Sequence, residues 1–230
     1  MAVHNKTHTD AAAPENRSSR PQDTQRQPAL PAVVDVTIPR RWDGFLAYVI
    51  SQVCSPPVLS AVAMALLAST LPHARAWRWA GLYVFLAILT PVIYLLWLVR
   101  HGRVTDLDVQ LREQRMRPLI VTIACGAAAW IALALGGAPI EMVVVAGGLW
   151  LQTVVIFSIT LWWKISVHSA AAASVATLVW SLAGTSLPLL IGVPIIAWSR
   201  VRLRRHTVSQ TIAGALLGLA IFLVTVWMAC

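Results

Sequence analysis

Two short polar stretches combine histidine with basic residues, and each directly precedes an apolar segment. They read KISVHS (164–169) and SRVRLRRHTVSQ (199–210), and they carry His168 and His206. An imidazole can attack phosphorus or donate a proton, and the forked guanidinium of arginine binds phosphate oxygens. Because arginines and backbone N–H groups at helix starts can carry the phosphoryl charge, we expect no metal and no other cofactor. The combination predicts phosphoryl chemistry.

A third polar stretch, TDLDVQLREQRMRP, occupies residues 105–118. Arg112 and Arg115 are three residues apart, so a helix would place both side chains on one face. Asp106 has two interpretations, a helix-capping group that pairs with nearby arginines or a group that assists a catalytic histidine. The stretch therefore adds further candidate ligands for phosphate.

The composition of the remaining chain indicates the elements that position these residues. Hydrophobic residues make up 58% of the chain and charged residues only 12%, against roughly 25% charged residues in a soluble domain. Apolar runs of about 20 residues, apolar on every face, are typical of helices that cross the bilayer. We therefore expect residues 43–230 to form an all-α, polytopic membrane helix bundle with six to seven transmembrane helices. Residues 1–42, rich in polar and charged residues, are expected to be a disordered cytosolic tail.

Charge distribution predicts how this bundle is oriented. If seven segments cross the membrane, the tail and all three polar stretches lie on one side, with every Lys and Arg except Arg75 and Arg78. Basic loops remain in the cytoplasm, so we expect the N-terminus and the site to be cytoplasmic in a plasma or inner membrane. The net charge of +9 is interpreted in the same way, and we expect no nucleic-acid partner. Apolar segments are expected at about 45–71, 77–99, 119–135, 140–163, 169–184, 185–198 and 208–229.

The stretch 199–218 resembles the third motif of the type 2 phosphatidic acid phosphatase superfamily, which includes membrane lipid phosphatases. That motif, SR-x5-H-x3-D, is matched by SR at 199–200 and by His206, while Gln210 stands where the family has Asp. The resemblance implies that His206 is the nucleophile that forms a phosphohistidine and that Arg200 binds phosphate. Since Gln210 is one helical turn after His206, its carbonyl could still accept the Nδ1–H and fix the tautomer.

The other two family motifs are present in altered form, and the whole resemblance covers about residues 105–218. The family's PSGH corresponds to ISVH, which implies His168 as the general acid for the leaving alcohol and Ser166 as a hydrogen-bonding group. The family's K-x6-RP ends here in Arg117, which is implied to bind phosphate, but Gln110 stands at the lysine position.

The missing lysine has two kinds of replacement in the sequence. Arg112 and Arg115 are the first candidates, and Lys164, four residues before His168, is the second. With these residues the resemblance implies a metal-independent lipid phosphate phosphatase, a phosphoric ester hydrolase that acts on a phosphomonoester or diphosphate. The expected partner is a bilayer lipid, namely a polyprenyl phosphate, a phosphorylated polyprenyl-sugar or a phosphatidate-like lipid.

Two other functions remain open. The run DLDVQLREQRMRP loosely resembles the first Asp-rich motif of membrane prenyltransferases, which bind a polyprenyl diphosphate through magnesium. Those enzymes need a second Asp-rich loop, whereas Glu141 is the only acidic residue from 114 onward. The replacements in the motifs would also fit a catalytically degenerate membrane scaffold. Independently of function, Gly214 and Gly218 in GALLG predict close helix packing, which we expect within the chain in preference to between copies.

Overall fold

The computed structural model describes residue 1 and residues 41–72, 74–104 and 112–229, with backbone only for 112–115. These ranges contain helices and no strand, so the expected all-α fold is confirmed for them. The tail expected over residues 1–42 lies almost entirely outside them. The elements are α1 (Trp42–Val53), α2 (Pro56–Thr70), α3 (Arg75–Tyr83), η1 (Val84–Leu89), α4 (Thr90–Arg100), α5 (Arg112–Gly136), α6 (Ile140–Thr160), α7 (Val167–Ala183), η2 (Pro188–Gly192), α8 (Val193–Arg202) and α9 (Val208–Ala229).

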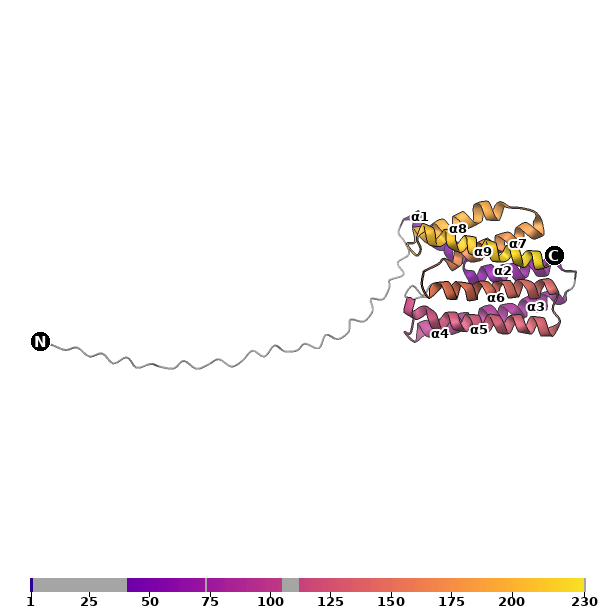
Figure 1. Ribbon diagram of the computed structural model, residues 1–230, viewed down its shortest axis with the longest axis horizontal. Coiled ribbons are helices and arrows are strands. Elements are labelled where there is room, and N and C mark those ends of the chain that lie inside the picture. The colour runs from indigo at the N-terminus through magenta and orange to yellow at the C-terminus, as the bar shows by residue number, and fades with distance from the viewer. Residues whose placement is uncertain (2–40, 73, 105–111, 230) are drawn as a thin grey trace. The chain divides into compact units, whose positions relative to one another are not determined.

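The helices lie side by side within the unit formed by residues 34–230 (Figure 1). Helix α7 packs against α2, α8, α9 and η2, while α5 packs against α6, α3, α4 and η1. Helix α6 connects the two groups because it contacts both α5 and α9. The two histidine-containing stretches, 164–169 and 199–210, therefore belong to the group of helices that surrounds α7.

Helix α7 is the central helix of that group. Every residue from His168 to Leu178 is buried, and most of them are Ala or Ser, whose small side chains allow neighbouring helices to approach. Ser166 caps its start, since its Oγ accepts the Ser169 N–H at 3.3 Å. Gly184 ends it with φ 65°, a left-handed conformation that glycine adopts without strain.

The closest approach in the bundle joins α7 to α9. A Cβ added at Gly214 would collide with the carbonyl oxygen of Ser166, and one added at Gly218 would collide with that of Ala170. Both obstacles are backbone atoms, which cannot rotate away as a side chain can. The prediction that GALLG packs helices within the chain is confirmed.

Prolines break two of the apolar segments. The segment expected over 45–71 is two helices bent by 50°, because Pro56 and Pro57 begin a new helix at α2. The long helix from α3 to α4 contains the π-helical turn η1 just before Pro91. A proline cannot donate to the carbonyl four residues earlier, and a π-turn is one way in which a helix adjusts to it.

The number of helices able to cross a membrane is lower than the six to seven expected. Among the described residues four stretches are long and apolar enough, and the bent pair α1–α2 makes a fifth if it is one span. Helix α7 has 17 residues, and the stretch of η2 and α8 is broken up by Pro188 and Pro194. Both fall short of the roughly 20 residues that a span requires. The four are Arg75–Arg100, Met116–Gly136, Ile140–Thr160 and Val208–Ala229.

The close contact of Gly218 with the backbone of α7 predicts that adding one methyl group there lowers the stability of the protein. Gly218→Ala should lower the free energy of unfolding by about 1–3 kcal/mol, the usual cost of overpacking a tight contact. Gly81→Ala is the matched control, because no atom lies within 4 Å of an added Cβ there, and it should be neutral or stabilising by up to about 1 kcal/mol. Thermal unfolding of the detergent-solubilised variants measures both, and equal melting temperatures would contradict the packing role of Gly218.

Candidate functional site

The turn between α8 and α9 gathers basic residues at one end of the bundle. The Arg200 carbonyl accepts the N–H groups of Arg205 at 3.0 Å and of His206 at 3.3 Å, which folds the chain back after α8. Arg204 adopts φ 54° within this turn, a left-handed conformation that is uncommon for residues other than glycine. The turn thus places three consecutive basic residues, 204 to 206, one residue before the start of α9.

Helix α9 begins with a reciprocal capping box. Thr207 Oγ1 accepts the Gln210 N–H at 3.3 Å, and Gln210 Oε1 accepts the Thr207 N–H at 3.2 Å. This is the S/T-x-x-E/Q arrangement that satisfies two otherwise unpaired N–H groups at a helix start. Because a backbone N–H can only donate, the side-chain atom of Gln210 that faces it must be the carbonyl oxygen.

That oxygen also determines the state of the His206 ring. Gln210 Oε1 lies 3.2 Å from His206 Nδ1, and an amide oxygen can only accept. Nδ1 therefore carries the proton, and in the neutral ring Nε2 carries the lone pair. Gln210 thus selects the tautomer in which Nε2 is the nucleophilic nitrogen.

These residues line an open pocket of about 390 Å³. Two arginines and a lysine contribute positive charge, His206 contributes an imidazole, and no acidic residue occurs among the described residues that line it. Such a wall favours an anion, and guanidinium groups bind phosphate or carboxylate oxygens in pairs. The lining residues are Lys164, Val201, Arg204, Arg205, His206, Thr207 and Gln210.

The start of α7 is joined to this pocket through the backbone. The Ser166 N–H donates to the Gln210 carbonyl at 3.2 Å, while the Ser166 side chain is buried and accepts from the Ser169 hydroxyl at 3.0 Å. His168 is buried in the first turn of α7. Neither side chain is among those that line the pocket. Gln210 thus connects the segment that carries His168 with the ring of His206.

Two arginines of α8 contact side chains of α1, and neither is among the residues that line the pocket. Arg200 is 3% exposed, and its Nη1 donates to Ser51 Oγ at 2.5 Å. Arg202 pairs with Asp43 through Nε at 3.0 Å and Nη2 at 2.8 Å. The arginine of the SR motif therefore contributes its carbonyl group to the turn and its guanidinium to the contact between α8 and α1.

The remaining predicted residues lie on or before α5. Arg117 is exposed and is not one of the residues that line the pocket. Arg112 and Arg115 are in the first turn of α5, but their side chains lie outside the described part of the structure, and Asp106 lies wholly outside it. Of the predicted residues, the structure brings together Lys164, His206 and Gln210 in one pocket, while Ser166 and His168 lie in the adjoining segment.

Several residues at this site were missed by sequence reasoning. Arg204 and Arg205 fill the spacer of the SR-x5-H motif and are not among the predicted phosphate ligands, and no partnership between Thr207 and Gln210 was predicted. The T-x-x-Q spacing was a usable signal for the capping box. Ser51 and Asp43 gave no signal, since they are 149 and 159 residues from their arginine partners.

Comparison with known proteins gives no relative. No family model, no curated protein and no solved structure matches this chain.

The double role of Gln210 can be tested without an activity assay. Gln210→Met removes the acceptor at similar size, so the His206 ring should return to the Nε2–H tautomer that prevails in free neutral histidine. Nitrogen-15 NMR of histidine-labelled protein reports the change, with His206→Asn to assign the signal. His101, whose Nδ1 lies 2.8 Å from the Trp97 carbonyl oxygen, is an internal control that should not change.

The same variant should also destabilise α9 by about 1 kcal/mol, because it loses half of the capping box. Gln210→Glu keeps an acceptor and should retain both the tautomer and the cap. If the His206 tautomer is the same in the Met and Glu variants, Gln210 does not control it.

Proposed function

We propose that this integral membrane protein is a lipid phosphate phosphatase whose site is the basic pocket at the α8–α9 turn. The observation that carries the proposal is the Gln210–His206 contact, which directs the lone pair to Nε2 in a pocket lined by Lys164, Arg204 and Arg205. A nucleophilic imidazole among cations is suited to attack on a phosphate ester. The resemblance of the SR-x5-H motif to the type 2 phosphatidic acid phosphatases supports the same reaction.

The first step transfers the phosphoryl group to the protein. His206 Nε2 attacks phosphorus, the bond between phosphorus and the lipid oxygen breaks, and that oxygen takes a proton from a general acid. His168 is proposed as this acid because it lies in the α7 segment that is hydrogen-bonded to Gln210 through Ser166. The lining cations stabilise the charge on the phosphoryl oxygens.

The second step returns the protein to its starting state. A water molecule gives a proton to the now neutral His168 and attacks phosphorus, and the P–N bond breaks to release inorganic phosphate. Throughout both steps the Nδ1–H of His206 donates to Gln210 Oε1. An amide stabilises a positively charged ring less than a carboxylate would, so we expect slower turnover than with Asp at position 210.

The pocket is proposed to face the cytoplasm. Helices α5 and α6 both qualify as spans and are joined by a short turn, so the start of α5 and the end of α6 lie on one side. Residues 164–166 follow the end of α6 after a short turn. The backbone hydrogen bond between Ser166 and Gln210 joins them to the start of α9. That side holds the basic residues of the three polar stretches, and Arg75 and Arg78 lie at the other end of the α3–α4 span. The positive-inside rule makes the basic side cytoplasmic.

The proposed nucleophile is tested with purified protein and radiolabelled lipid phosphates in mixed micelles. The wild-type protein should release inorganic phosphate, and after denaturation without acid it should carry radiolabelled phosphate on His206. The rate of phosphate release by His206→Asn should be lower by about 10³-fold or more, as expected for a missing nucleophile. His101→Asn is the matched control, since this exposed histidine lies at the end of α4, and it should keep wild-type activity.

Two results would contradict the phosphatase proposal. Equal, slow phosphate release from wild type and His206→Asn would show that the ring is not a nucleophile. Activity that disappears in EDTA and produces diphosphate from a prenyl donor would instead indicate magnesium-dependent prenyl transfer.

Orientation is tested by labelling the two ends of one span. In a background without the native cysteines, Arg103→Cys should react with a membrane-impermeant maleimide only from the cytoplasmic side, and Arg75→Cys only from the opposite side. Both side chains are exposed in the structure. Labelling with the reverse sidedness in intact cells and inverted vesicles would overturn the cytoplasmic assignment.

A further inference from the structure

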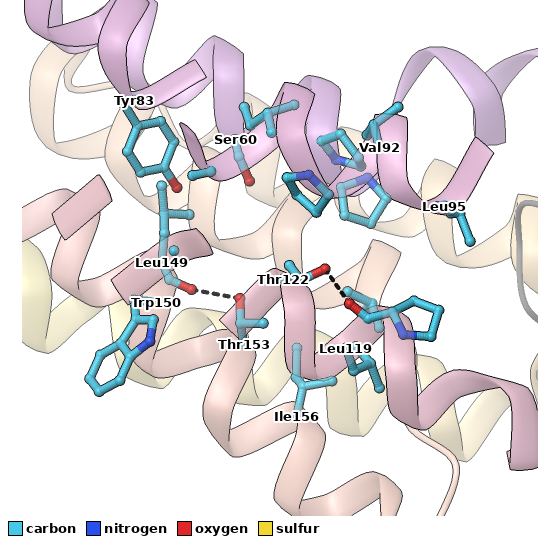
Figure 2. A pocket seen from close by; sticks show the side chains of 18 residues that line it. Ser60, Tyr83, Val92, Leu95, Leu119, Thr122, Leu149, Trp150, Thr153 and Ile156 are labelled. Carbon is cyan, nitrogen blue, oxygen red and sulfur yellow. Dashed lines mark hydrogen bonds between the residues drawn. The ribbon is translucent and has the colours of Figure 1, made fainter. Parts of the chain in front are cut away.

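An apolar cavity of about 230 Å³ lies inside the bundle, separate from the basic pocket. In Figure 2 Tyr83, Val92 and Leu95 form one wall, and Leu119, Thr122 and Ile156 face them from the other. The walls come from the start of α2, from η1 and α4, from α5 and α6, and from the first residue of α7. Three of the helical stretches concerned are long enough to cross a membrane, so the cavity lies among helices that contact lipid chains.

Three of the five hydrogen-bonding side chains in the cavity wall bond within the protein, and the other two, Ser60 and Tyr83, contribute hydroxyl groups to a wall that is otherwise apolar. Thr122 Oγ1 donates to the Pro118 carbonyl at 2.8 Å and Thr153 Oγ1 donates to that of Leu149 at 2.9 Å, as the dashed lines of Figure 2 show. Trp150 Nε1 donates to the Ile123 carbonyl at 3.2 Å. These residues present methyl and ring surface to the space between them. A lining of this kind suits a hydrocarbon and offers little to a polar ligand.

The shape of the cavity depends on an irregular helix. The π-turn η1 and its flanks contribute Tyr83, Ala87, Ile88 and Pro91 to the wall. A π-turn widens a helix locally, costs stability and is found frequently at functional sites. The irregular turn thus lies on the cavity wall, next to Pro91, which lacks an N–H.

The cavity and the basic pocket each have a lining residue on the short segment that leads into α7. Lys164 lines the pocket and Val167 lines the cavity. Three residues of chain span at most about 10 Å, which is a short distance compared with the length of a lipid chain. A molecule with a phosphate in the pocket therefore has a hydrocarbon site within reach on the other side of the 164–167 segment.

We propose that this cavity binds a single hydrocarbon chain of the lipid whose phosphate occupies the basic pocket, so that single-chain lipid phosphates are the preferred substrates. The volume, about 230 Å³, exceeds the roughly 150 Å³ of an engineered apolar cavity that binds benzene. A cavity of this volume holds a segment of one chain and leaves no space beside it for a segment of a second chain. The placement of the phosphate in the basic pocket rests on the proposed function. The binding of a hydrocarbon chain in the cavity, called the chain site below, can be tested by itself.

The test fills the cavity from α5. Thr122→Phe places a ring in the space between the two walls of Figure 2, and Ala124→Phe, two residues later on the exposed side of the same helix, is the matched control. Ala87→Phe fills the cavity from η1 and serves if Thr122→Phe does not fold. The substrates are hexadecyl phosphate, butyl phosphate and dioleoyl phosphatidate, and the measured quantity is kcat/KM in mixed micelles.

We expect wild type to prefer hexadecyl phosphate to dioleoyl phosphatidate, and Thr122→Phe to lose about 10-fold or more on hexadecyl phosphate. Such losses are usual when a hydrophobic subsite is blocked. Activity on butyl phosphate should stay within about twofold, and Ala124→Phe should match wild type throughout. Equal losses on hexadecyl and butyl phosphate, or no loss on either, in a variant with wild-type thermal stability would overturn the inference.

A binding measurement separates this inference from the proposed function. Hexadecyl phosphonate carrying a diazirine in its chain, which the protein cannot hydrolyse, should crosslink to α5, α6 or η1 in wild type, as read by peptide mass spectrometry. The crosslink should be lost in Thr122→Phe and kept in Ala124→Phe. If this pattern holds in a protein without phosphatase activity, the chain site stands and the catalytic proposal fails. Crosslinks confined to the outer face of α9 would overturn the chain site.

Discussion

The contact between the backbones of α7 and α9 is the constraint on which the arrangement of the site depends. Gly214 and Gly218 face the carbonyl groups of Ser166 and Ala170 with no room for a Cβ. This closeness lets the Ser166 N–H reach the Gln210 carbonyl. The segment before α7 and the turn before α9 are thus held at a fixed separation by main-chain atoms, and the side chains that line the pocket project from this rigid base.

Gln210 combines three tasks that are usually divided among several residues. Its carbonyl group joins α7, its N–H and its side chain complete the capping box with Thr207, and its Oε1 lies against His206 Nδ1. The capping box explains how an amide can orient the imidazole at position 210, because the Thr207 N–H determines which way the amide faces. What the amide lacks is charge, so it orients the imidazole and stabilises its cationic form only weakly.

The sequence predicted the class of fold and the contact between His206 and Gln210 better than it predicted the partners of other side chains. Continuous apolar runs predict spanning helices because length and hydropathy are local properties, and His206 with Gln210 was identified because both lie on one turn. The number of spans was overestimated, since apolar content does not distinguish a helix buried in protein, such as α7, from one in lipid. The Arg200–Ser51 contact was unpredictable, because no local pattern relates residues so far apart in the chain.

The burial of α7 has a consequence for the way in which the protein responds to its membrane. A helix exposed to lipid must match the hydrocarbon thickness, and a mismatch is relieved by tilting or by deforming the bilayer. Helix α7 is enclosed by other helices along its first eleven positions after Val167, so its 17 residues do not have to match that thickness. Changes in bilayer thickness act first on lipid-facing spans such as Met116–Gly136. The segment that carries His168 therefore senses the surrounding lipid only through the helices that enclose it, above all through α9, which is itself a candidate span.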